Sequence, residues 1–220
     1  MKPILFDFNG TLFFDADINY IAWKQTIDEL SNNTIDFNSL YEEYKSVRNF
    51  LFIKKVFELL NYPYDEEKIM YWANRKETKY YHTYCREHQR NQLAPGAEEF
   101  LNYLKENNIP INLCTASLKV NVDFYFEYLN LGKWFDKNII AYDDGTFYDK
   151  EEMYKACAKR INKDIKDCIV IEDSPSSILQ AIKAGCTNII AIEREDTPNL
   201  KEIKQIIKDF REIDKSVVEL

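Results

Sequence analysis

The sequence has 220 residues, of which 45% are apolar and 30% are charged. This length suits one ordinary domain with an insertion, and the apolar fraction can form a buried core, which excludes a disordered or fibrous protein. The formal net charge is −8, and the 29 basic and 37 acidic residues are mixed along the chain. This charge balance argues against a nucleic-acid partner.

The sequence also argues against a membrane protein. No apolar run is long enough to cross a bilayer, and residues 1–11 lack the charged head and the long apolar middle of a secretion signal. We therefore expect no membrane partner and predict a cytoplasmic location.

Cysteine and histidine do not form a metal-binding pattern. The five cysteines are odd in number and scattered, without a C-x-x-C pair, so that reduced and mostly buried thiols are expected. They are Cys85, Cys114, Cys157, Cys168 and Cys186. His82 and His88 are six residues apart, a spacing that does not place two ligands on one helix face, and we interpret them as solvated residues near helix ends.

Short β-rich segments recur along the chain, and each is followed by a helical pattern. The expected strands span residues 3–8, 109–115, 138–142, 168–171 and 188–192. Strands that alternate with helices form a parallel sheet that is covered on both faces, with right-handed crossover connections. The sequence therefore predicts an α/β fold with a doubly wound parallel sheet, that is, a Rossmann-like core.

A long insertion separates the first two expected strands. The chain spends about ninety residues between them, far more than one crossover helix requires. Apolar side chains recur there at helical spacing, without clear strands. We therefore predict a helical cap domain over residues 15–91 and a core domain made of residues 1–14 and 92–220.

Two further helices are expected in the core. Pro95 and Gly96 mark the entry to the first of them. The second is a closing amphipathic helix over residues 200–210, where isoleucines recur at helical spacing.

Polar side chains follow the carboxyl ends of the expected strands, where open α/β sheets bind their ligands. The first strand leads into Asp7, Asn9, Gly10 and Thr11. Alternation along the strand directs Asp7 and Asn9 to the same side, and the backbone turns at Gly10. The Asp7 carboxylate is thus expected to point into the crevice at the end of the strand, and Gly10 and Thr11 are expected beside a bound substrate.

Two more strand ends supply groups that suit an anion. After the second strand, Thr115 offers a hydroxyl, and Ala116 and Ser117 offer backbone N–H groups at the expected start of a helix. After the third strand, Lys150 opens a helix and brings one positive charge to the same crevice. These groups together form a candidate phosphate site.

The fourth strand ends in an acidic pair, Glu172 and Asp173, followed by Ser174 and Pro175 as a helix start. Carboxylates at neighbouring strand ends, without His or Cys, suit a hard ion such as Mg²⁺ better than Zn²⁺. Asp7, Glu172 and Asp173 are therefore the expected Mg²⁺ ligands.

In this order and at these strand ends, the motifs resemble those of the haloacid dehalogenase superfamily of phosphohydrolases and phosphotransferases. The most specific match is the stretch 172–176, which runs on to Ala184 and Gly185. The resemblance covers nearly the whole chain and is closest to the β-phosphoglucomutase and phosphoglycolate phosphatase-like group. One subgroup of this superfamily has a helical cap inserted just after the first motif.

The resemblance implies a role for each motif. Asp7 resembles the nucleophile, Thr115 the hydroxyl motif, Lys150 the lysine, Glu172 and Asp173 the metal-binding acids, and the Asn9 backbone carbonyl can face the Mg²⁺ cofactor. The implied activity is Mg²⁺-dependent hydrolysis of a small phosphorylated metabolite. Asp7 attacks the phosphorus in line, Mg²⁺ and Lys150 offset the charge, and water releases phosphate from the phosphoaspartyl intermediate.

The sequence departs from the family pattern at two positions. The commonest pattern has a second aspartate two residues after the nucleophile, where this chain has Asn9, whose amide cannot transfer a proton. General acid–base catalysis is worth about 10² to 10⁴ in rate, so efficient hydrolysis of ordinary alkyl phosphates is not expected. Lys150 is followed by Glu151 where the family often has proline, and Lys137 is the reserve candidate for the lysine.

Several interpretations of Asn9 stay open. The substrate has a leaving group that needs no proton, or another group acts as the acid, or the protein is a weak enzyme that binds a phosphometabolite or regulates. The residue is alternatively an engineered change, or it deamidates to a carboxylate because Gly10 follows it.

Three other functions compete with hydrolysis. A sugar-phosphate mutase remains an alternative, although Asn19 stands where that branch tends to have histidine. A dehalogenase would leave the acidic pair without a purpose, and a phosphate-receiver domain is much shorter and has no cap.

The resemblance implies that the cap closes over the crevice and selects the leaving group. Arg48 and Lys45, beside Tyr44, are the expected contacts for an anionic or sugar substrate. Solvated basic residues on a helix face are an equally good interpretation. The sequence does not predict an oligomeric state.

Overall fold

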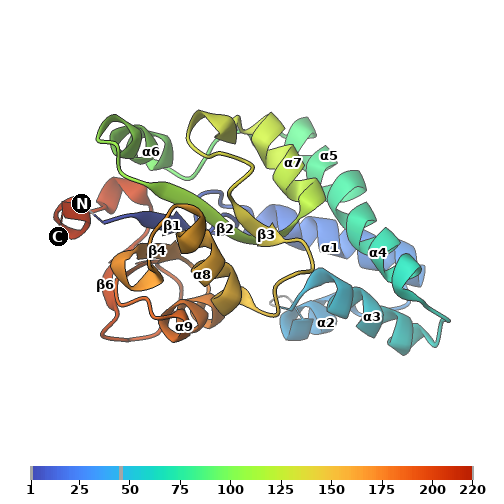
Figure 1. The fold of residues 1–220 in the computed structure, drawn as a ribbon. Coiled ribbons are helices and arrows are strands. Elements are labelled where there is room, and N and C mark those ends of the chain that lie inside the picture. Colours follow the sequence, from blue (N-terminus) through green and yellow to red (C-terminus); the bar gives the residue numbers. More distant parts are fainter. Residues whose placement is uncertain (1, 45–46, 220) are drawn as a thin grey trace. The chain divides into compact units, whose positions relative to one another are not determined.

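The protein forms two compact units in a computed structural model that describes residues 2–44 and 47–219. The core unit comprises Met1–Phe14 and Gln92–Leu220, and the helical unit comprises Asp15–Asn91 (Figure 1). Within the described ranges, every helix is too short or too polar to cross a bilayer.

The core unit contains one parallel sheet of six strands (Figure 1). The strands are β1 (Ile4–Phe6), β2 (Ile111–Leu118), β3 (Ala141–Asp143), β4 (Ile169–Glu172), β5 (Ile189–Ile192) and β6 (Ile203–Ile207). Their order is β3-β2-β1-β4-β5-β6, so the chain builds outward from β1 on one side, returns, and builds outward on the other. The direction in which successive strands are added therefore reverses between β1 and β4, and doubly wound sheets bind their ligands at such a point.

Helices cover the sheet because both of its faces are apolar. The core helices are α6 (Ala97–Glu106), α7 (Lys119–Tyr128), α8 (Lys150–Arg160), α9 (Pro175–Ala184) and α10 (Ser216–Glu219), with short 3-10 turns η2 (Leu131–Lys133), η3 (Ile165–Asp167) and η4 (Phe210–Glu212). In β1, Leu5 packs in the cluster that contains buried residues of α8 and α9. Phe6 points to the opposite face, where its ring contacts those of Phe100 and Phe210. Side chains that alternate along a fully buried strand thus give one core on each side of the sheet.

The helical unit consists of α1 (Ala16–Ser31), α2 (Phe37–Tyr44), α3 (Asn49–Leu60), α4 (Glu66–Arg75), the π-helix η1 (Lys76–Tyr81) and α5 (His82–Glu87). Its core consists of aromatic and aliphatic side chains such as Trp23 and Phe52, whose ring centroids lie 4.4 Å apart. Asn32 and Asn61 end α1 and α3 in the left-handed conformation, which asparagine tolerates better than most residues.

The α/β fold and its five expected strands are confirmed, and the five cysteines are free and buried as expected. The closing helix predicted over residues 200–210 is wrong, because this segment forms β6 and η4. Pairing with β5 buries Ile207 and half-buries Ile203, so the isoleucines serve an edge strand.

The interpretation of the histidines is correct for one residue and wrong for the other. His88 follows the end of α5 and is exposed. His82 is only 5% exposed, because α4, η1 and α5 continue into one another and place this residue within a helical run instead of at its end.

Candidate active site

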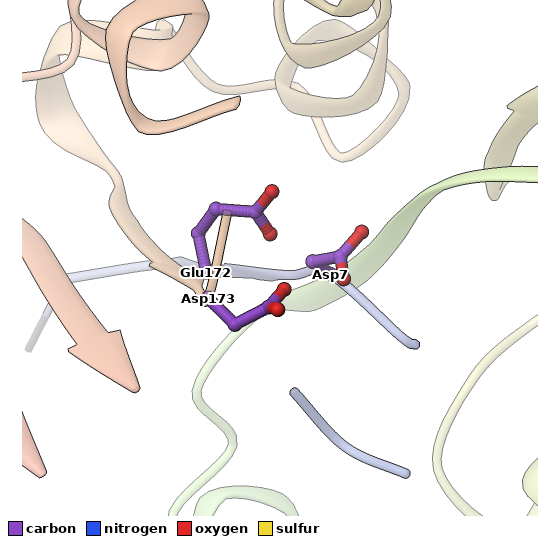
Figure 2. Close-up of side chains that lie close together, drawn as sticks. All are labelled: Asp7, Glu172 and Asp173. Carbon is purple, nitrogen blue, oxygen red and sulfur yellow. The ribbon is translucent and has the colours of Figure 1, made fainter. Parts of the chain in front are cut away.

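Three carboxylates meet at the carboxyl ends of β1 and β4. The two strands pair in register from Ile4 with Ile169 to Phe6 with Ile171, and the Asp7 backbone N–H donates to the Ile171 carbonyl oxygen at 3.0 Å. The residues that follow on the two strands are therefore neighbours. Figure 2 shows the side chains of Asp7, Glu172 and Asp173 gathered close together.

Ligand atoms of these three carboxylates lie within 4.8 Å of one another, and all three residues are buried. The approach of the first loop to Asp173 requires a glycine, since a Cβ on Gly10 would overlap the Asp173 carboxylate. Gly10 also has a φ of +79°, a conformation that other residues adopt at a cost. The loop after β1 is thus shaped to bring Asp7 and Asp173 together.

Lys150 is the first residue of α8 and supplies the positive charge. Its Nζ donates to Asp7 Oδ1 at 2.6 Å and to Glu172 Oε1 at 2.9 Å, with only 12% of the side chain exposed. Burial disfavours the ammonium form, yet the charges of Asp7 and Glu172 outweigh it and raise the Lys150 pKa well above its ordinary value. Lys150 therefore stays protonated.

The acidic group fits a magnesium ion. Burial and the nearby charge of Asp7 raise the pKa of Glu172 well above its ordinary value, and the same causes raise that of Asp173. Glu172 Oε2 is fully buried and has no hydrogen-bond partner among the described residues. An unpaired buried oxygen beside two further carboxylates is an all-oxygen donor set of the kind that Mg²⁺ prefers.

Asn9 is held by two hydroxyl groups of the core unit. Ser117 Oγ donates to Asn9 Oδ1 at 2.6 Å, and Asn9 Nδ2 donates to the Tyr125 hydroxyl oxygen at 3.0 Å. The ring of Tyr125 is itself fixed by stacking on Phe8, with centroids 4.2 Å apart. The amide oxygen of Asn9 therefore has a hydrogen-bond donor, and its NH₂ group has an acceptor.

The hydroxyl motif after the second strand lies on the strand itself. β2 continues to Leu118, where it pairs with Asp143 of β3 after a register shift, and α7 begins only at Lys119. The expected helix start at Ala116 and Ser117 is therefore wrong. Thr115 is buried, and its Oγ1 accepts from the Ser117 backbone N–H at 3.2 Å.

Two residues near the site were missed by the sequence interpretation. They are Arg194, whose Nη1 lies 2.9 Å from Asp173 Oδ2, and Tyr125, which contacts Asn9. Thr11, which the sequence did indicate, has its Oγ1 3.5 Å from Asp173 Oδ1. Arg194 follows β5, so its place after a strand end could have suggested it. Tyr125, the other missed residue, left no comparable signal in the sequence.

The remaining candidates are Lys137, Arg48 and Lys45. Lys137, the reserve lysine, pairs with Asp123 at 2.7 Å and has 44% of its side chain exposed, whereas Lys150 binds Asp7. Arg48 precedes α3 in the helical unit, so its predicted contact with substrate stays a prediction. Lys45 lies outside the described residues.

The chain resembles known hydrolases in sequence and structure. A family model of haloacid dehalogenase-like hydrolases matches residues 1–185. A HAD hydrolase of family IA, variant 3, from Entamoeba histolytica HM-1:IMSS is 30% identical with a TM-score of 0.86, and the match covers 100% of this chain and 98% of that one. A β-phosphoglucomutase from Clostridium difficile shares the fold, with 24% identity, a TM-score of 0.78, and coverage of 100% of this chain and 96% of that one.

The first three matches to curated sequences are shorter. A bifunctional riboflavin kinase/FMN phosphatase from Arabidopsis thaliana is 28% identical over 116 residues, which are 52% of this chain and 30% of that protein. The matches to the first three such relatives span 30%, 55% and 56% of their lengths, and each of these relatives is named as a phosphatase.

Proposed function

Because the chain belongs to the haloacid dehalogenase-like hydrolases, we propose that it is a Mg²⁺-dependent phosphohydrolase acting on a small phosphorylated metabolite. The reaction proceeds through a phosphoaspartyl intermediate on Asp7. The observation that carries this proposal is the position of the Lys150 ammonium group, which contacts Asp7 and Glu172. This contact lies at the ends of β1 and β4, between which the order of strand addition reverses.

Asp7 is the nucleophile in this proposal. Its carboxylate is held by Lys150 Nζ at 2.6 Å, which limits its rotation. The same ammonium group is fixed in place before a substrate arrives, and it offsets the charge that develops on a transferring phosphoryl group. The Thr115 hydroxyl and the Ala116 backbone N–H are proposed to bind the phosphoryl oxygens, whereas the Ser117 N–H donates to Thr115 Oγ1.

Asp7, Glu172 and Asp173, with the backbone carbonyl of Asn9, would hold the magnesium ion. When bound, this ion supplies positive charge beside the phosphoryl group. The unpartnered Glu172 Oε2 and the proximity of the three carboxylates support this assignment.

Asn9 limits the reaction that this site performs. Its amide is bound by Ser117 and Tyr125, and it can neither protonate a leaving group nor take a proton from water. We therefore expect turnover to depend on a leaving group that departs without protonation, such as that of an acyl phosphate or of an acidic alcohol. Alkyl phosphates are hydrolysed slowly.

The helical unit is proposed to act as the cap that selects the substrate, with Arg48 as one of its contacts. A cytoplasmic location remains part of the proposal. A second candidate function, a weakly active protein that binds a phosphometabolite or regulates, is favoured by Asn9 alone. The sugar-phosphate mutase alternative rests on a shared fold.

The test is release of phosphate from an aryl phosphate with and without Mg²⁺. We expect release that requires Mg²⁺ and that falls by at least about 10³ in Asp7→Asn, since an amide is not a nucleophile for phosphorus. Lys137→Met is the control, because this lysine pairs with Asp123 at the surface and should leave the rate unchanged. Release that persists in Asp7→Asn would exclude the phosphoaspartyl route, and binding of phosphate without turnover would favour the second candidate.

A further inference from the structure

Arg194 is a charged residue of the site to which the proposed reaction assigns no role. It lies two residues after the end of β5, and its Nη1 donates to Asp173 Oδ2 at 2.9 Å. Its Nε donates to Asp196 Oδ1 at 3.0 Å, so that the guanidinium group spans two carboxylates. The group is partly exposed, with 40% of the Arg194 side chain accessible against 12% of that of Asp173.

The backbone of Arg194 is fixed as well. Its N–H donates to Thr197 Oγ1 at 2.8 Å, and the Thr197 N–H donates back to the Arg194 carbonyl oxygen at 3.1 Å. These reciprocal bonds close the turn from which the side chain extends. The guanidinium group is therefore positioned before any ligand binds, which lowers the entropy lost in forming the contact with Asp173.

The two oxygens of Asp173 consequently differ. Oδ2 is paired with the guanidinium group, whereas Oδ1 has Thr11 Oγ1 at 3.5 Å, the outer limit of a hydrogen bond. The carboxylate cannot move away toward the first loop, because Gly10 lies directly against it. An ion at this site therefore finds one oxygen of Asp173 available, and the second only if the pair with Arg194 breaks.

This difference distinguishes magnesium from calcium. Mg²⁺ requires near-ideal octahedral geometry with short bonds, and one oxygen of a carboxylate satisfies it. Ca²⁺ accepts six to eight oxygens and readily takes both oxygens of one carboxylate. Resting on the proposed function, we propose that Arg194 is a metal-specificity residue: by holding Oδ2 of Asp173, it leaves a single oxygen to the ion and so favours Mg²⁺ over Ca²⁺.

Charge and ligand number have separable effects in this proposal. Removing the charge of Arg194 strengthens the binding of both divalent ions, because the three carboxylates then face one cation fewer. Freeing Oδ2 helps Ca²⁺ specifically. The ratio of the Ca²⁺ and Mg²⁺ dissociation constants therefore reports the freed oxygen, since the effect of charge largely cancels from it.

The test measures that ratio by calorimetric titration of the whole chain with MgCl₂ and with CaCl₂ at one ionic strength. Arg194→Met removes the charge and the donors while keeping a long side chain. We expect the ratio of the Ca²⁺ to the Mg²⁺ dissociation constant to fall about tenfold, which corresponds to ~1.4 kcal/mol. Lys183→Met is the matched control, because this lysine on α9 is 66% exposed and pairs with Glu151; it should leave the ratio unchanged.

Each outcome has a defined meaning. A lower ratio in Arg194→Met with an unchanged ratio in Lys183→Met supports the assignment. Tighter binding of both ions at a constant ratio overturns it, because Arg194 would then act through charge alone. If the original chain binds Mg²⁺ but the ratio is the same in Arg194→Met, only this inference is refuted. If the original chain binds neither ion, the proposed metal site is refuted as well.

Discussion

Replacing Lys150 with methionine should destabilise the core unit in a way that depends on pH. The substitution keeps a long side chain but removes the ammonium group that contacts Asp7 at 2.6 Å and Glu172 at 2.9 Å. Glu172 is fully buried, so its charge would be left without the compensating cation. A buried carboxylate in that position takes up a proton instead of staying charged.

The free-energy cost of this proton uptake sets the size of the destabilisation. Glutamate in an unfolded chain has a pKa of about 4.3, so keeping Glu172 protonated at pH 7 costs up to ~3.7 kcal/mol, within the ~3–5 kcal/mol typical of a broken buried pair. At pH 5 the same cost is only ~1 kcal/mol. Burial already raises the pKa of Glu172, and loss of Lys150 raises it further. The folded variant then binds more protons than the unfolded chain above pH ~4.3, so its stability falls as the pH rises.

The assay is urea unfolding of the original chain and of Lys150→Met at pH 5 and at pH 7, followed by circular dichroism. We expect the loss in unfolding free energy to be larger at pH 7 than at pH 5, by up to ~2.7 kcal/mol. Lys183→Met removes an exposed pair with Glu151 and should change the unfolding free energy little at either pH. Equal losses for Lys150→Met at both pH values would refute the electrostatic reasoning.

Three further predictions concern the same unit. Gly10→Ala should lower the free energy of unfolding by at least ~1 kcal/mol and weaken Mg²⁺ binding by displacing Asp173. Gly145→Ala, at a similar φ but in open space, should leave Mg²⁺ binding unchanged, and calorimetry measures Mg²⁺ binding to both variants. Asn112→Leu should cost at least ~2 kcal/mol in urea unfolding, because the buried amide donates to two backbone carbonyl oxygens, and a smaller loss would contradict this. Mg²⁺ should raise the melting temperature more at pH 8 than at pH 5, because burial raises the pKa of Glu172 and of Asp173 and protons compete with the ion; an equal rise at both would count against these ligands.

Much of the sheet and of the acidic site could be predicted because it depends on local patterns. A short apolar run before Asp7 and another before Glu172 indicate buried strands, and parallel strands carry their ligands at the same edge. Lys150 was expected at the start of a helix, and α8 begins there. These features need only the spacing of apolar residues and the chemistry of the residues that follow them.

The rest depends on contacts that no local pattern reveals. Tyr125 contacts Asn9 across 116 positions in the chain, and Arg194 contacts Asp173 only because a turn closed by Thr197 aims its side chain. Ile203 and Ile207 have a spacing that fits a helix as well as a strand, and pairing with β5 decides between them. Tertiary contacts therefore set the details of the site that local reasoning left open.

The central claim is that the site is complete for phosphoryl transfer except for the proton carrier at Asn9. Its replacement by aspartate should keep the local structure, because Ser117 still donates to the carboxylate and the Tyr125 hydroxyl can turn to donate as well. The most direct measurement compares phosphate release by the original chain and by Asn9→Asp from an aryl phosphate and from alkyl and sugar phosphates. The claim predicts a gain of about 10² to 10⁴ for the alkyl esters and a much smaller gain for the aryl ester. Equal gains for all esters, or none for any of them, would contradict it.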